Sequence, residues 1–167
     1  MARGTDSFFI RANVEVTNGA FSQTELDLGA YVDALGKSVL KIHNVQLAFQ
    51  DATALYRPPV YNAGTGADLA WQLSTQTQAA ILRPSDRSIV SAGSIQCGDV
   101  TAGNITTEAA GVNVQHFTDG YLIAVESLYL GGQQTGMSNN TSVSIVLECT
   151  VESLTQSAAM ALALSQQ

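Results

Sequence analysis

Two segments of the chain alternate between apolar and polar residues, as a strand with one buried face does. In residues 8–17 the even positions are apolar, and the odd positions are polar apart from Phe9. In residues 142–152 the polar face is interrupted only by Val146. The apolar face of that segment consists of Val143, Ile145, Leu147, Cys149 and Val151. Both segments are predicted to be half-buried strands, and these five side chains should face the core.

Other apolar or alternating runs between turn-forming residues predict further strands at 24–28, 38–49, 69–73, 88–96 and 121–130. In the 38–49 run the apolar parity changes midway, which predicts a β-bulge near His43 and Asn44. Loops are expected at 56–66 and 133–140, one or two helical turns at 30–35, and irregular or loosely stranded chain at 98–111.

After Leu154 the pattern changes to that of a helix. Residues 155–164 are rich in alanine, leucine and methionine, and Ser153 or Thr155 could cap the start. The segment carries no charge, and so short a helix is marginal alone in water. It must therefore pack on its own domain or on a neighbouring copy. We favour the neighbour, and predict Met160, Leu162 and Leu164 as subunit-interface residues.

The elements together indicate an all-β protein. About eight strands, with no strand–helix alternation, predict an antiparallel β-sandwich rather than a parallel α/β sheet. Neither an internal repeat nor a linker is visible. We therefore expect a single β-sandwich domain over residues 1–167, in which 154–167 form a helical tail.

Composition adds information about the surface. The chain has 167 residues and a net charge of −7, and charged residues make up only 13%, about half the roughly 25% of typical domains. Serine, threonine, glutamine and asparagine are abundant instead. Such a surface repels copies of itself only weakly, which suits self-assembly. The negative charge excludes a strongly basic nucleic-acid binder, and the apolar content of 46% excludes a disordered chain.

Candidate catalytic and metal-binding residues are few. His43 and His116 form no zinc motif, and the chain has no nucleophile elbow. Glu25, Asp27 and Asp33 could in principle bind calcium, but their spacing does not match the calcium-loop pattern, so we interpret them as solvated carboxylates. We predict no enzyme activity, no catalytic residue, no metal site and no cofactor.

Three other residues have two readings each. Trp71 alternates within a strand, so a core or interface anchor is favoured over a sugar platform. Cys97 and Cys149 are interpreted as small buried hydrophobic residues, although a disulfide between them is a second possibility.

No signal-peptide pattern precedes Ser7, and no apolar run reaches the roughly 18 residues of a membrane span. We expect synthesis in the cytoplasm.

The strand count and loop pattern resemble those of single jelly-roll capsid proteins of icosahedral viruses. The resemblance extends over the whole chain and is carried by no motif. It implies two four-stranded sheets packed face to face and a self-assembling coat subunit of a virion, made in the host cytoplasm. The alternatives are a tail, fibre or appendage subunit, or a β-sandwich module that binds a ligand.

One departure from that family bears on the partners. Many jelly-roll capsid proteins carry a basic N-terminal arm, whereas here only Arg3 precedes the first strand among the seven scattered cations. Strong direct binding to nucleic acid is therefore not expected. Besides copies of the chain, the resemblance implies other virion proteins or an underlying membrane as partners, as in small coat proteins of membrane-containing viruses of bacteria and archaea.

Overall fold

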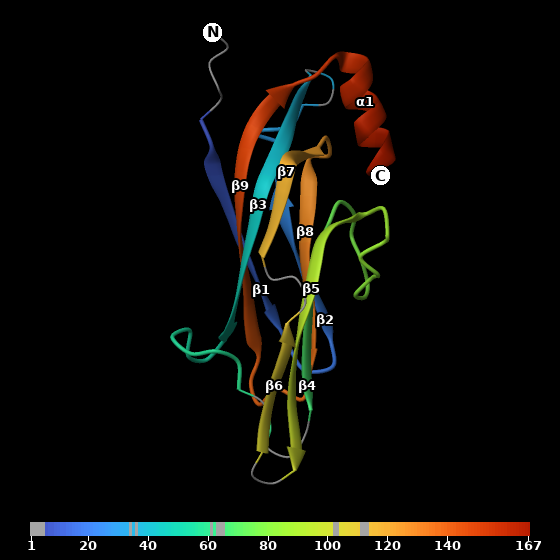
Figure 1. Cartoon of the computed structure of the whole chain (residues 1–167). Helices are drawn as coiled ribbons and strands as arrows, with labels where there is room; N and C mark the ends of the chain where they lie inside the picture. Colours follow the sequence, from blue (N-terminus) through green and yellow to red (C-terminus); the bar gives the residue numbers. More distant parts are fainter. Residues whose placement is uncertain are drawn as a thin grey trace.

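The computed structural model describes residues 6–33, 35, 37–60, 62, 66–101, 104–110 and 114–167, and for 97–101 and 104–110 it describes the backbone alone. Two antiparallel sheets pack face to face, with one helix near the C-terminus (Figure 1). The first sheet, sheet A, contains in spatial order β1 (Phe8–Val16), β9 (Thr141–Ser153), β3 (Ser38–Asp51) and β7 (Val114–Ile123). The second sheet, sheet B, contains β2 (Phe21–Asp27), β8 (Ser127–Thr135), β4 (Ala67–Ser74), β5 (Ile89–Thr101) and β6 (Asn104–Ala110). The helix is α1 (Gln156–Ser165).

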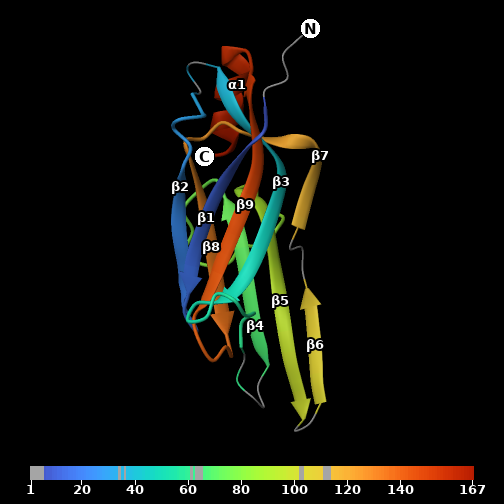
Figure 2. The same ribbon diagram turned by 90° about the vertical axis from the view of Figure 1, so that its left-hand side faces the viewer.

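The strand order is that of a jelly roll. The strands β1-β9-β3-β7 face β2-β8-β4-β5, and the chain changes sheet at every connection except β4–β5 and β5–β6. The predicted all-β antiparallel sandwich with a C-terminal helix is thus confirmed. Sheet B has one strand more than the expected four, because β6 pairs with β5 as a hairpin at the sheet edge (Figure 2).

The core lies between the sheets and follows the alternation of the sequence. On β9, Val143, Ile145, Leu147 and Cys149 are buried in it, as predicted, while Val151 is only partly buried. Trp71 of β4 is buried in the same cluster, which confirms the core reading of this residue.

The β-bulge in β3 is confirmed. Against β9 the register shifts between Ile42 and Asn44, which leaves His43 as the extra residue of β3. Against β7 the register breaks at the same place, but there the surplus residues are 117–120 of β7. Leu40 and Ile42 before the bulge and Val45 after it are all buried in the core. One inserted residue therefore keeps a fourteen-residue strand facing the same way along its length.

The strand predicted at 121–130 is wrong as a single element. These residues end β7 and begin β8, and 124–126 carry the chain from one sheet to the other. Gly120 and Gly131, whose positions suggest the two ends of this strand, each lie inside a strand instead. Gly120 lies inside β7 with φ of 78°, and the Lys41 side chain occupies the space where a Cβ would be. Gly131 lies inside β8, and the ring of Phe21 crosses it.

Other predicted boundaries shift in the same way. The one or two helical turns expected at 30–35 are a single hydrogen-bonded turn, in which Tyr31 N and Val32 N both donate to Leu28 O. Chain expected to be loosely stranded at 98–111 belongs to β5 and β6, apart from residues outside the described ranges. The loop expected at 133–140 begins only after Thr135.

The segment between β4 and β5 folds back over sheet B. Buried Gln72 fixes it, since its Nε2 donates to Ala80 O at 3.0 Å and its Oε1 accepts from Leu82 N at 2.7 Å. Gln78 N donates to Gln23 Oε1 of β2 at 2.9 Å. These bonds hold residues 75–88 against the outer face of sheet B.

Candidate functional site

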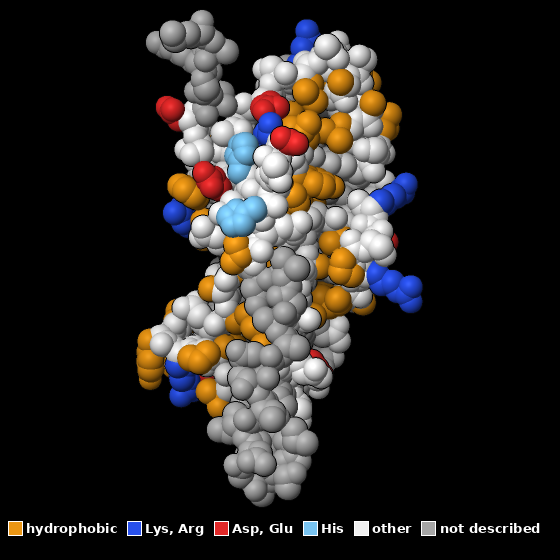
Figure 3. All heavy atoms as spheres, viewed as in Figure 1, with side chains coloured by type: hydrophobic (Ala, Val, Ile, Leu, Met, Phe, Trp, Pro, Cys, Tyr) orange, Lys and Arg blue, Asp and Glu red, His pale blue; other side chains and the backbone are white. Residues whose placement is uncertain are grey.

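The two histidines lie on neighbouring strands of sheet A. His43 Nε2 lies 2.9 Å from Thr150 Oγ1, and His116 lies on β7 opposite Asn44. Both rings are visible on one face of the molecule (Figure 3). Within the described ranges, no three histidine, cysteine, aspartate or glutamate residues come together in a way that could hold a metal ion.

The three clustered carboxylates of the sequence have separate local roles. Glu25 Oε1 accepts a hydrogen bond from Ser127 Oγ at 2.5 Å, across the β2–β8 pair. Asp27 Oδ1 accepts from Gly29 N at 2.8 Å. The backbone of Asp33 pairs with Ser38. The structure therefore does not bring them together as a calcium site.

The structure describes the side chain of one of the two cysteines, Cys149. Cys149 is buried and free, and burial, followed by the negative charge of Glu148, raises the pKa of its thiol to about 12. The side chain of Cys97 lies outside the described residues, so the predicted state of this residue stays a prediction.

The C-terminal helix packs on its own sandwich, not away from it. Thr155 caps it, because its Oγ1 accepts from Ala158 N. Ala159 is buried in a small cluster with Val39 of β3 and Ala124 of the β7–β8 connection. The helix therefore covers the upper end of the molecule (Figure 1).

Gln166 holds the end of this helix in place. Its Oε1 accepts from Ala124 N at 2.9 Å and its Nε2 donates to Leu122 O at 2.8 Å. Its own carbonyl accepts from Thr75 Oγ1 at 2.7 Å. The residue is buried although it stands in a polar sequence end. Nothing in the pattern distinguished it from the exposed Gln167 beside it, and the sequence analysis missed it.

The predicted interface residues divide into two groups. Leu162 is partly buried against the Ala159 cluster of its own domain. Its contact with a neighbouring copy stays a prediction. Met160 is 43% exposed and Leu164 69% exposed. These two form an outward apolar face on a helix without charges, hereafter the helix face (Figure 3, upper right). Their contact with another subunit stays a prediction.

A second exposed apolar surface lies at the other end of the sandwich. The loop after β3 exposes Leu55 (58%), Tyr56 (91%) and Val60 (40%). Residues 51–60 are hereafter the β3–β4 loop, at the lower left of Figure 1. The sequence predicted a loop here but gave no sign of an apolar tip.

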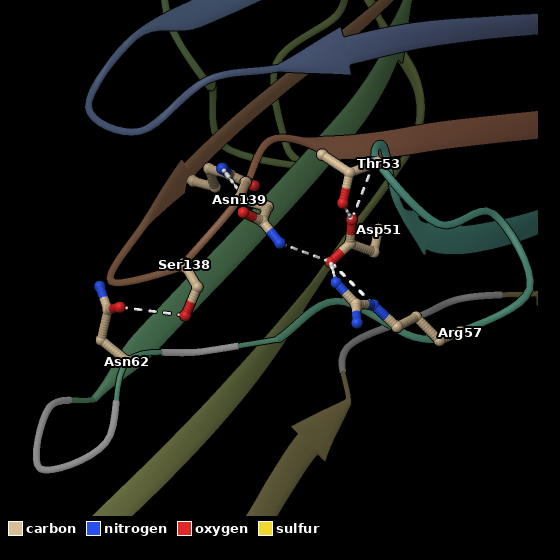
Figure 4. A network of polar contacts seen from close by, with 7 residues as sticks. Asp51, Thr53, Arg57, Asn62, Ser138 and Asn139 are labelled. Carbon is tan, nitrogen blue, oxygen red and sulfur yellow. Dashed lines mark hydrogen bonds and ion pairs between the residues drawn. The ribbon is translucent and has the colours of Figure 1, made fainter.

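Asp51 fixes the base of the β3–β4 loop (Figure 4). Its buried carboxylate accepts from Thr53 Oγ1 at 2.5 Å and Thr53 N at 2.8 Å, from Asn139 Nδ2 at 2.9 Å, and from Arg57 Nη2 at 2.9 Å and Nε at 3.2 Å. These hydrogen bonds, those of Thr53 first, hold the pKa of Asp51 well below its ordinary value. The ionised form is thus the one that fits the site.

Further hydrogen bonds, from backbone and side chains, hold the loop on both sides. Asp51 N donates to Arg57 O at 3.1 Å, and Gln50 Nε2 donates to Leu55 O at 2.6 Å. On the other side, Ser138 N donates to Val60 O at 2.7 Å, and the hydroxyl of Ser138 donates to Asn62 Oδ1 (Figure 4). The loop therefore presents its apolar tip from a fixed base.

A groove of about 400 Å³ borders the β3–β4 loop. Two serine residues of β9 and Leu55 of the loop are among the residues that line it. It is lined by Arg11, Ala12, Asn13, Gln50, Leu55, Ser142, Ser144, Ile145 and Val146.

Fold and site together define a jelly-roll β-sandwich that exposes apolar side chains on the helix face and the β3–β4 loop. Comparison with known proteins adds no relative: no family model matches the chain, and no curated protein matches it significantly. In the part of the chain that the structure describes, no helix is long and apolar enough to cross a membrane.

Proposed function

We propose that this chain is a self-assembling structural protein, most specifically a coat subunit of a viral shell. The observation that carries the proposal is a jelly-roll sandwich that exposes an uncharged apolar helix face. The jelly roll is an architecture that viral capsid proteins use, but it hosts other functions too, so the surface has to carry the argument.

The helix face supports assembly through its energetics. Met160 and Leu164 expose apolar area on a helix that has no acidic residue in its first turn and no basic residue in its last. Burying apolar area stabilises a contact by about 25 cal/mol per Å². With only 13% charged residues in the chain, copies repel each other little as they approach.

Two observations favour a shell over the alternatives. A subunit that donates its first strand to the next copy would leave its own sheet open, whereas β1 pairs with β9 of its own chain from Phe8 to Val16. A ligand-binding module would gather its exposed aromatic rings on one surface. Among the described residues the most exposed ring, Tyr56, follows β3, whereas Tyr31 precedes that strand and Phe9 lies on β1 beside Phe8, which stacks on Tyr31. A fibre or appendage subunit is the remaining alternative.

The partners in this proposal are first of all copies of the chain. Its net charge of −7 does not favour a direct contact with nucleic acid. A second virion protein or a membrane under the shell then contacts the genome, and the protein's place is the virion.

Electron microscopy of the purified protein across a concentration series tests the proposal. We expect closed shells or the rings from which they are built. Open filaments would favour the fibre alternative, and a protein that stays monomeric at high micromolar concentration would contradict self-assembly.

A double variant connects that assay to the helix face. Met160→Gln with Leu164→Gln keeps helix propensity but makes the face polar, so assembly should weaken while the fold persists. Val114→Gln is the matched control, since Val114 is 53% exposed on β7. Equal assembly of the double variant and this control would remove the helix face from the proposal.

A further inference from the structure

We propose that the β3–β4 loop and its groove form a two-fold contact between two copies, in which Tyr56 of each copy enters the groove of the other. The inference rests on the proposed self-assembly and goes further, because it assigns a second contact, its partner and its symmetry. It does not use the helix face, so the two can be tested separately.

The first argument is the rigidity of the tip. Asp51 accepts five hydrogen bonds from the loop and from Asn139, and Gln50 binds the carbonyl of Leu55 next to Tyr56. Ordering a flexible loop on binding lowers affinity, whereas a loop ordered by folding avoids most of that loss. A tyrosine 91% exposed on such a base is suited to serve as an anchor.

The second argument is charge. Arg57 at the tip is neutralised by the ion pair with Asp51, so the tip brings no net charge to a neighbour. Among the groove-lining side chains, Arg11 carries the one charge, and its guanidinium lies 5.5 Å from the ring centre of Phe9. A tyrosine ring entering the groove can stack on that guanidinium as well, which is a favourable cation–π contact. No like charges meet.

The third argument is shape. The protruding tip and the groove share Leu55, so a convex and a concave surface lie side by side. A two-fold contact needs one patch that is complementary to itself, and a knob beside a hole meets this condition when the axis passes between them. The groove, at about 400 Å³, has room for a tyrosine side chain. These properties favour a second copy as the occupant.

The matched set of variants is Tyr56→Ser in the tip, Ser144→Tyr in the groove lining and Val114→Ser as the exposed control outside both. Sedimentation velocity over a concentration series measures the dimer dissociation constant of each. Removal of the anchor and filling of the groove should each weaken the dimer at least tenfold, with the control unchanged. Far-ultraviolet circular dichroism and thermal midpoints establish that each variant is folded.

Thiol cross-linking tests the geometry directly. An equimolar mixture of Tyr56→Cys and Ser144→Cys chains, held at a concentration at which the Tyr56→Ser protein still dimerises, should be cross-linked by a bifunctional thiol reagent about as long as a tyrosine side chain, above the level of either single variant and of the natural chain. A folded Tyr56→Ser protein that dimerises as the natural chain does, or a mixture that cross-links no more than its controls under these conditions, overturns the inference.

The outcomes separate this inference from the proposed function. Tyr56-dependent dimers without shells would support the contact and contradict the shell. Shells that form equally well with Tyr56→Ser would support the shell and contradict the contact. In the Met160→Gln, Leu164→Gln protein the Tyr56-dependent dimer should persist, because the two surfaces lie at opposite ends of the sandwich (Figure 1).

Discussion

Replacing Gln166 with alanine tests whether the tail belongs to the folded domain. In the structure its carboxamide accepts one hydrogen bond from Ala124 N in the β7–β8 connection and donates another to Leu122 O of β7. Loss of the bond to Leu122 O costs about 1 kcal/mol net, and loss of the bond to Ala124 N leaves a buried amide without its partner, which costs about 1–3 kcal/mol. The free energy of unfolding should therefore fall by about 2–4 kcal/mol.

Urea denaturation measures this change, with Gln167→Ala as the matched control because Gln167 is exposed. An unchanged dependence on urea would show that the unfolded surface area is the same, so that the midpoint alone reports stability. Hydrogen exchange gives a local readout: the Ala124 amide should exchange faster in Gln166→Ala.

The reasoning fails if the two variants unfold within about 0.5 kcal/mol of each other, which is the usual range of neutral surface changes. Such a result would mean that the helix end does not dock on its own sandwich. The tail would then be available to a neighbour, as the sequence pattern alone suggested.

Further predictions concern the core, the loop base and the thiol. In urea denaturation, Leu147→Ala should lower the free energy of unfolding by about 2–5 kcal/mol, because the side chain is fully buried. Val146→Ala on the opposite face should lower it by less than about 1 kcal/mol, and similar losses in the two variants would refute the register. Asp51 has a lowered pKa in the fold, so its contribution to stability is complete above its unfolded pKa of about 4 and is lost as pH falls below that value. Thermal midpoints between pH 5 and 2 should decline less steeply in Asp51→Asn than in the natural chain, and parallel curves would contradict the assignment. In a Cys97→Ser background, Cys149, whose pKa is raised to about 12, should react with a thiol reagent only on unfolding; rapid labelling of the native protein would show that it is accessible.

The sequence predicted the strands whose two faces differ most in polarity. The inward residues of β9 and the bulge at His43 follow directly from period two and its interruption, because a strand must keep its apolar side in the core. The class of fold follows as well, since alternating strands without crossover helices pack as a sandwich. These predictions depend on local pattern alone.

Features that depend on distant contacts could not be predicted in this way. Gly120 looks like a turn, yet it lies within β7, where a glycine is needed because φ is 78° and the Lys41 side chain of β3 occupies the space of a Cβ. The chain crosses between the sheets at Ala124 without a glycine or proline to mark the change. The backbone amide of Ala124 instead donates to the side chain of Gln166, which lies 42 positions away in the sequence. A one-dimensional pattern carries no signal for a partner so far along the chain.

The candidate surfaces show the same limit. Met160 and Leu164 were identified from an uncharged segment, but which helical residues turn outward depends on how Ala159 docks. The tip at Tyr56 was missed entirely, because a short apolar pair beside two prolines looks like an ordinary loop. Its exposure follows from Asp51, which binds the loop through residues on both sides of it.

The placement of α1 and the β3–β4 loop at opposite poles of the sandwich determines how many neighbours one subunit can join. A particle with a single self-complementary patch stops growing at the pair. A subunit with two independent patches can join a ring of copies through one and a two-fold neighbour through the other, so that linked rings can close into a shell. Small amounts of a chain whose β3–β4 loop is blocked would then still enter the rings but leave gaps between them.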